Sequence, residues 1–310
     1  MKKHIFILGA CALALMACNK VQTDGPHADF NDNQIVFTTR AEAGTRATGV
    51  TEVGDGQNGT QELTSFNVIA SKGTSNQTAY FTDGVFTGTY YTSYKGGKYW
   101  PADETTTDTW NFYASNATMT FNPSGATIAV SDCNVDVVAE YKSNASYRQS
   151  NNLVFDHILC QLATVTMKAP EGYTVNNLTV TIVPVFNGVY NMVTNTWQVG
   201  TPAATATTIF SANLTEGGQA TSADNDLWLL PGRYQVHASY TLVKGEFSKE
   251  YTKSAYVNLV QGVNNHLRLP GPNHDQPNIP GPDQGDEVEV AFTVEVTPWT
   301  DGYVDVDFTN

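Results

Sequence analysis

One cysteine near the start of the chain occupies a position where covalent modification is expected. Residues 1–17 begin with a basic stretch that includes Lys2 and Lys3 and continue with an apolar run, as secretory signals do. This run is shorter than the roughly 20 residues that a membrane-spanning helix needs. It ends in Leu15-Met16-Ala17-Cys18, which resembles a lipobox. We predict a signal peptide over residues 1–17 and lipid attachment at Cys18; the alternative is an ordinary signal peptide followed by an incidental cysteine.

The other reactive side chains lack the spacing of a catalytic or metal site. The chain contains no His-Glu-x-x-His, no Gly-x-Ser-x-Gly, no P-loop and no dinucleotide-binding glycine motif. His157, His237 and His266 are far apart and fall on expected strands, so we interpret them as packed or hydrogen-bonded residues. The Asx-Gly cluster at 54–59 fits turn chemistry better than a calcium loop. The sequence predicts no enzyme activity and no cofactor or metal.

Two further cysteines, Cys133 and Cys160, remain after the signal region. An exported pair of this kind can form a disulfide. Unpaired cysteines also behave as small apolar residues and are often buried. The sequence leaves both possibilities open.

Composition limits the class of protein. Only 15% of the 310 residues are charged and the formal net charge is -14, whereas soluble domains carry about 25% charged residues. Few basic residues argue against nucleic-acid binding and against a polybasic membrane-surface protein. A 41% hydrophobic and 11% aromatic content is enough for a sizeable core. Abundant threonine and tyrosine favour strands, so we expect an exported, all-β protein of about two domains.

Alternating patterns and turn dipeptides predict many short strands. We expect turns at Asp83-Gly84 and at Gly96-Gly97, each between two strands. A strand at 227–230, a turn at Pro231-Gly232 and a strand at 234–242 follow later in the chain. Short strands with closely spaced turns are typical of β-sandwiches.

The chain ends with a linker and a well-patterned strand pair. Residues 270–286 are rich in Pro and Gly, which predicts a semi-extended linker. After it, five apolar side chains alternate with polar ones and share one face: Val288, Val290, Phe292, Val294 and Val296. This apolar face must be buried. Either the pair folds back as the last hairpin of its own domain, or its strand completes the sheet of a neighbouring subunit.

Motifs spread over most of the chain resemble those of the fimbrillins, the subunits of the major (type V) fimbriae of Bacteroidales. Each motif is weak alone, and the resemblance rests on their order together with the lipobox. They are a first strand at 34–38, Thr45-Arg46-Ala47, Lys98-Tyr-Trp-Pro101 with Trp110-Asn-Phe-Tyr-Ala114, Phe155-Asp-His157 with Leu162-Ala-Thr-Val165, Leu229-Leu-Pro-Gly232, and Val294-Glu-Val-Thr-Pro-Trp299.

The resemblance implies a fold and a maturation route. The fold would be two tandem transthyretin-like (Greek-key) β-sandwiches with a C-terminal donor-strand hairpin. The implied segments are a signal peptide at 1–17, a lipidated leader with the first strand at 18–46, sandwiches at 47–150 and 151–269, a linker at 270–286 and a strand pair at 287–310. A trypsin-like surface protease would cut after Arg46, with Arg40 as a second candidate site.

Such a cut would remove the lipid and the strand that holds Ile35 and Phe37. A sheet that loses a strand is left with an apolar groove and unpaired backbone groups. The C-terminal strand of another subunit could fill this groove, and head-to-tail donation that does not close on itself builds a filament. The resemblance therefore implies polymerisation by strand exchange.

The function expected from the sequence is that of a structural pilin subunit of a cell-surface fimbrium that contributes to adhesion. Its partners would be other copies of itself or related pilins, the outer membrane through the lipid anchor before processing, and a host or bacterial surface ligand, but no nucleic acid. It would occur as an outer-membrane precursor and in the extracellular fimbrium. The alternatives are a fimbrial anchor or accessory lipoprotein that keeps its lipid and first strand, or a surface glycan-binding β-sandwich lipoprotein.

Overall fold

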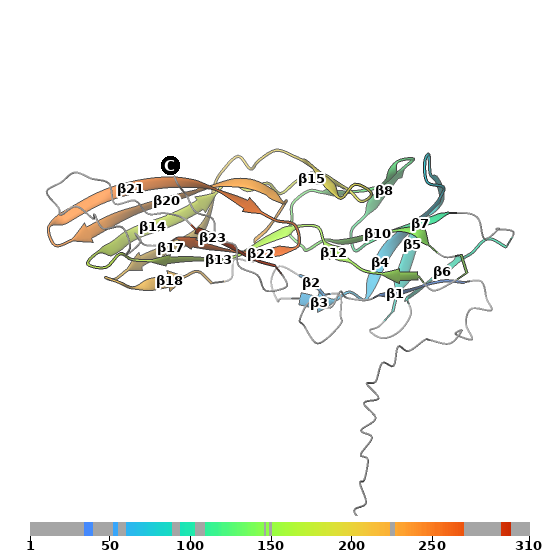
Figure 1. Cartoon of the computed structure of the whole chain (residues 1–310), viewed down its shortest axis with the longest axis horizontal. Coiled ribbons are helices and arrows are strands. Elements are labelled where there is room, and N and C mark those ends of the chain that lie inside the picture. Colours follow the sequence, from blue (N-terminus) through green and yellow to red (C-terminus); the bar gives the residue numbers. More distant parts are fainter. Residues whose placement is uncertain are drawn as a thin grey trace, which may run out of the picture.

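The computed structural model confirms the all-β class. It describes residues 34–39, 52–54, 60–88, 94–102, 109–145, 147–148, 151–223, 227–269 and 293–298, and these ranges contain strands, turns and bends without a helix. None of these residues therefore forms a helix able to cross a membrane. The strands form two lobes that lie end to end along the long axis of the molecule (Figure 1).

The N-terminal lobe is built on one eight-stranded sheet. In spatial order its strands are β11 (Asn151–Leu153), β1 (Gln34–Thr39), β6 (Tyr94–Tyr99), β5 (Thr78–Thr87), β4 (Ser65–Lys72), β7 (Trp110–Ser115), β10 (Val138–Ala145) and β12 (Asp156–His157). A separate two-stranded ribbon pairs β2 (Glu52–Gly54) with β3 (Thr60–Glu62). The inward-facing side chains of the large sheet form an aromatic core that includes Phe66, Phe86, Trp110 and Phe112.

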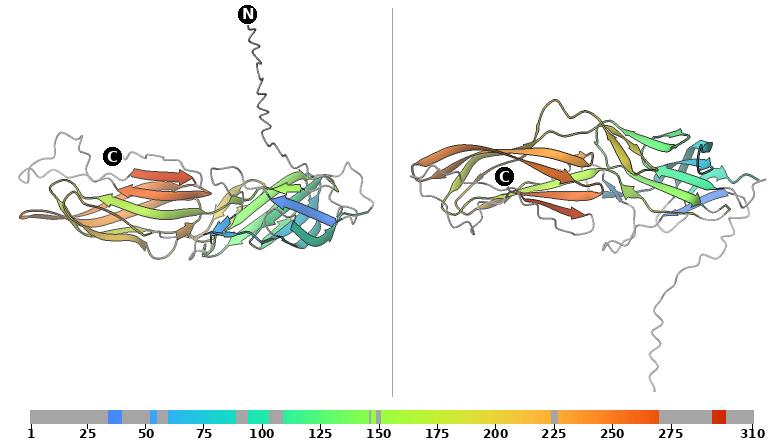
Figure 2. Two further views of the ribbon diagram at one scale, coloured as in Figure 1. Left: turned by 90° about the horizontal axis from the view of Figure 1, so that it is seen from below. Right: turned by 45° about the horizontal axis from the view of Figure 1, so that its top comes forward.

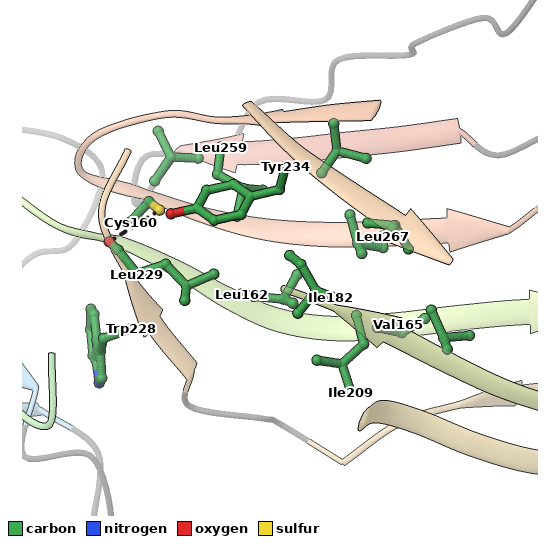
Figure 3. Close-up of a cluster of buried hydrophobic side chains, with 14 of the residues drawn as sticks. Cys160, Leu162, Val165, Ile182, Ile209, Trp228, Leu229, Tyr234, Leu259 and Leu267 are labelled. Carbon is green, nitrogen blue, oxygen red and sulfur yellow. Dashed lines mark hydrogen bonds between the residues drawn. The ribbon is translucent and has the colours of Figure 1, made fainter. Parts of the chain in front are cut away.

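The C-terminal lobe consists of two sheets that share a core. The first contains β18 (Gln219–Thr221), β13 (Cys160–Lys168), β22 (Val263–Leu269) and β23 (Thr293–Pro298), with β19 (Leu227–Leu229) also paired to β13. The second contains β17 (Thr207–Leu214), β14 (Thr174–Ile182), β20 (Gly232–Lys244) and β21 (Phe247–Leu259). Aliphatic and aromatic residues of both sheets, among them Leu162, Ile182 and Leu267, meet in the core (Figure 3).

A further sheet, which we call the bridging sheet, connects the lobes. Its strands are β16 (Thr196–Val199), β15 (Gly188–Asn191), β9 (Gly125–Val130) and β8 (Met119–Asn122). Strands β8 and β9 come from the first half of the chain and β15 and β16 from the second, and β9 pairs with β15. The core of the C-terminal lobe continues into this sheet through Ile128 and Tyr190. The two lobes are therefore joined by backbone pairing as well as by side-chain packing.

Strands on both sides of residue 150 belong to the first lobe. β11 pairs with β1, and β12 pairs with β10. The second lobe then begins with β13 at Cys160. The expected limit at 150 and the transthyretin-like topology stay predictions, whereas the strand-turn-strand pattern around Pro231-Gly232 is confirmed by β19 and β20.

Two expected turns are wrong. Asp83-Gly84 lies inside β5, and Gly96-Gly97 lies inside β6. A β-carbon at Gly84 would lie 2.8 Å from the Val68 carbonyl oxygen, and one at Gly96 would lie 2.4 Å from that of Val85. Real β-carbons do not approach backbone oxygens so closely. These glycines therefore allow neighbouring strands to pack closely, a use that glycine has in strands as well as in turns.

Candidate strand-exchange site

Strand β1 lies inside the eight-stranded sheet and has a paired neighbour on each side. It pairs in parallel with β11, where Phe37 lies opposite Asn151, and antiparallel with β6, where Phe37 lies opposite Tyr94. The ladder with β6 shifts register between Gln34 and Val36. The backbone groups of β1 thus bond to strands that are distant in sequence, and its removal would leave both of those strands with an unpaired edge.

The three consecutive apolar side chains of β1 are buried. Ile35 and Phe37 are fully buried in the aromatic core, and Val36, which points the opposite way, is 4% exposed. The Phe37 ring meets Phe86 and Phe112 edge to face, each with a centroid distance of 4.8 Å. Burial of one such side chain contributes about 1.5–3 kcal/mol, so the three together contribute about 4.5–9 kcal/mol. The space that β1 fills, between β6 and β11 and above Phe86 and Phe112, is called the β1 slot below.

The expected processing residues frame this strand in sequence. Arg40 follows the last residue of β1 directly, and Arg46 lies six residues further on. A cut after either one would leave the strand attached only by non-covalent contacts. Arg40, Arg46 and Cys18 lie outside the described residues, so cleavage and lipidation stay predictions.

The C-terminal strand lies in the other lobe, at the edge of a sheet. β23 pairs antiparallel with β22, with Val294 opposite Leu267 and Val296 opposite Asn265. Figure 2 shows β23 in red beside β22, with β1 in blue in the N-terminal lobe. The expected donor residues Val288, Val290 and Phe292 lie outside the described residues.

This pairing within one chain corresponds to one of the two arrangements that the sequence left open. It does not test whether the same strand also moves to another subunit. In the described part of the chain β23 has one strand neighbour, whereas β1 has two. β23 has six register pairs, all with β22, whereas β1 has three with β11 and three with β6. The two strands therefore differ in the number of their neighbours and not in the total number of paired residues.

The histidines have local partners. His157 Nδ1 lies 2.5 Å from a carboxylate oxygen of Asp136, His237 Nδ1 lies 2.7 Å from Ser254 Oγ, and His266 Nδ1 lies 2.7 Å from Thr164 Oγ1. Among the described residues no group of three His, Cys, Asp or Glu side chains could hold a metal ion. The histidines that the sequence singled out are thus hydrogen-bonded on strands or strand ends.

Cys133 and Cys160 are buried free thiols. Cys133 Sγ lies 3.1 Å from the Phe186 carbonyl oxygen, and Cys160 Sγ lies 3.3 Å from that of Leu229. Figure 3 shows the Cys160 sulfur beside the hydroxyl of Tyr234, with a dashed line to the Leu229 carbonyl oxygen. Burial raises the pKa of Cys133 to about 12 and raises that of Cys160 as well, with small contributions from Asp132 and from Cys133 respectively. Both side chains therefore stay protonated at neutral pH and are poor nucleophiles.

Sequence reasoning missed the strands that form the two walls of the slot. Nothing in residues 94–99 or 151–153 marks them as neighbours of β1, because strand pairing depends on the fold as a whole. The buried face of β1 was visible in the apolar run Ile35-Val36-Phe37. The described architecture is that of an all-β protein in which strand β1 is paired on both sides within a sheet.

The family follows from a direct comparison. A family model described as fimbrillin-like matches residues 39–299, and the chain belongs to this family. No curated protein matches the chain.

Solved structures of bacterial proteins are also similar. A candidate cell adhesion protein from Bacteroides ovatus is 13% identical, with 87% of this chain and 98% of that chain covered and a TM-score of 0.43. A fimbrial assembly protein from Parabacteroides distasonis is 10% identical, with 88% and 99% covered and a TM-score of 0.35. A candidate adhesin from Bacteroides thetaiotaomicron is 8% identical, with 87% and 98% covered and a TM-score of 0.38.

Proposed function

We propose that this protein is a structural pilin subunit of a cell-surface fimbrium, exported as a lipoprotein and polymerised by strand exchange after proteolysis. The observation that supports it most is the double pairing of β1 and the burial of Ile35, Val36 and Phe37, in a strand that two arginines follow in the sequence. Membership of the fimbrillin-like family and the printed descriptions of its structural neighbours, cell adhesion and fimbrial assembly, agree with a surface role.

In this proposal, cleavage after Arg46 or Arg40 releases the leader with β1 and exposes the β1 slot. The C-terminal strand of a second copy, with Val288, Val290, Phe292, Val294 and Val296 on its apolar face, then takes the place of β1. It exchanges pairing with β22 alone for pairing with both β6 and β11. Backbone pairing on both sides of the donor strand and burial of its apolar face drive assembly.

An anchor subunit would instead keep its lipid and β1. N-terminal sequencing of the protein taken from cells distinguishes the two roles. A stalk subunit starts at Ala47, or at Ala41 if Arg40 is the site, and an anchor retains Cys18.

The test of the mechanism uses purified chain 19–310, treated with trypsin and followed by light scattering and electron microscopy. Wild-type chain should form filaments after cleavage, and the double variant Arg40→Ala with Arg46→Ala should stay monomeric. A chain ending at Gly285 should fold and be cleaved but should not polymerise, because it has no donor. Filaments from the double variant, or from the truncated chain alone, would refute the proposal.

A further inference from the structure

A pocket at the bridging sheet has the lining of a binding site and lies away from the β1 slot. It has a volume of about 460 Å³, within the range of about 300–1,000 Å³ that ligand pockets occupy. Three turns meet there: one between β4 and β5, one between β8 and β9, and one between β15 and β16. The lining residues are Thr74, Ser75, Asn76, Gln77, Pro123, Ser124, Tyr141 and Val193.

The turns are held together by specific contacts. The backbone N–H of Gln77 donates to the Pro123 carbonyl oxygen at 3.0 Å, and that of Met192 donates to the Ala126 carbonyl oxygen at 3.1 Å. Gly125 has a φ of 130°, and a β-carbon there would lie 2.3 Å from a methyl carbon of Val193. The positive φ therefore favours glycine at this turn, and the two backbone hydrogen bonds connect the turns that line the pocket.

Gln77 places two hydrogen-bond donors at the pocket. Its side chain is only 7% exposed, and its Oε1 accepts from Ser71 Oγ, from Tyr113 Oη at 2.6 Å and from Asn111 Nδ2 at 3.3 Å. Asn111 Nδ2 also donates to the Gly73 carbonyl oxygen, which fixes it as a donor and the facing Gln77 atom as an acceptor. Within the described part of the chain the other end of the amide, Nε2, makes no hydrogen bond to protein. Gln77 Nε2 is not one of the fully buried side-chain atoms that lack a partner, so it is open to solvent and can donate to water or to a ligand.

Tyr141 forms an aromatic wall. Its ring stacks on that of Tyr113 with a centroid distance of 4.9 Å and an interplanar angle of 14°. Burial, with a smaller contribution from Tyr141, raises the pKa of Tyr113 to about 12, so its hydroxyl stays a donor to Gln77 at neutral pH. The stacking and the hydrogen bond hold both the wall and the amide in place.

We propose that this pocket binds a neutral saccharide unit. A sugar presents hydroxyl edges, which need both donors and acceptors, and C–H faces, which pack on aromatic rings. The amide of Gln77, the hydroxyls of Thr74, Ser75 and Ser124 and the ring of Tyr141 supply these groups. None of the eight lining residues is Lys, Arg, Asp or Glu, and a charged ligand would lose hydration without a counter-charge. The inference adds a ligand class and does not depend on strand exchange.

The test uses the soluble chain 19–310 on a glycan array that carries neutral oligosaccharides of hexoses and N-acetylhexosamines beside sialylated and sulfated ones. The strongest neutral glycan is then titrated by saturation-transfer NMR. Tyr141→Ala and Gln77→Glu should each weaken binding at least tenfold, and Tyr141→Phe, which keeps the ring, should stay within about twofold.

Because substitutions at Tyr141 and Gln77 touch the packed network, two exposed positions provide a second test. Thr74→Trp and Ser75→Trp fill the pocket from its rim and should abolish binding. Ser211→Trp, at an exposed position of strand β17 in the other lobe, is the matched control and should bind as wild type. No binding to any neutral glycan, binding to acidic glycans alone, or binding that survives both rim substitutions would overturn the proposal, whatever the outcome of the polymerisation test.

Discussion

The substitution Phe37→Ala tests how much β1 contributes to the stability of the uncleaved chain and whether β1 leaves its slot after cleavage. The ring is fully buried and contacts Phe66, Phe86 and Phe112. Removal of a buried phenylalanine ring costs about 3–5 kcal/mol. We expect a loss of this size in the free energy of unfolding of the uncleaved chain, because the aromatic core around a strand paired on both sides cannot collapse freely into the cavity.

After cleavage the difference should disappear. If β1 leaves the slot, the remaining chain no longer contains residue 37, and wild type and variant become identical. Unfolding in urea can be followed by the fluorescence of Trp100 and Trp110, whose rings meet edge to face at 5.2 Å in the same core. Phe210→Ala in the C-terminal lobe is the matched control, since Phe210 is 6% exposed and remains in both forms.

The control should be destabilised to the same extent before and after trypsin treatment. The trypsin-treated samples are separated from any released peptide by gel filtration in mild denaturant. Two results would refute the reasoning: a loss of less than about 1 kcal/mol in the uncleaved Phe37→Ala chain, or a difference that persists after cleavage and gel filtration. The first would mean that Phe37 does not hold β1, and the second that β1 stays in its slot.

Two further predictions concern titratable groups. Burial, with a smaller contribution from Asp156, raises the pKa of Glu140 to about 7, so the folded state binds more protons than the unfolded state and stability should fall as pH rises from about 4.5 to 7. Because Glu140 is partly exposed, we expect the free energy of unfolding to fall by about 1–2 kcal/mol over this pH range, after discounting for solvent. Urea unfolding of the Glu140→Gln variant should lack this dependence on pH. An unchanged dependence in the variant would assign it to another group. Cys133 and Cys160 should resist iodoacetamide at pH 8 in the native chain 19–310 and react after denaturation, as read by mass spectrometry, whereas a missing reaction in denaturant without reductant would indicate a disulfide.

Local pattern was enough for the fold class and for several strands. The apolar run Ile35-Val36-Phe37 and the alternation in the C-terminal segment indicated strands, and β1 and β23 are strands. Glycine pairs were misleading, because Gly84 and Gly96 serve close packing between strands rather than turns. A glycine's role depends on what lies beside it, and the sequence alone does not contain that information.

Long-range pairing was the part that sequence could not supply. The bridging sheet joins strands from residues 119–130 and 188–199, and no local signal predicts that they meet. The same holds for Gln77, an ordinary polar residue after a turn, whose significance comes from three donors converging on its oxygen. Strand donation is a contact between two molecules, so the structure of one chain does not contain it.

The most direct test of the account is a cryo-EM reconstruction of filaments assembled from cleaved chain, read at the β1 slot between β6 and β11. We predict density there for the C-terminal strand of the neighbouring subunit, with the side chains of Val288, Val290, Phe292, Val294 or Val296 above Phe86 and Phe112. Density for residues 34–39 of the same subunit in the slot, with the C-terminal strand still paired to its own β22, would contradict it.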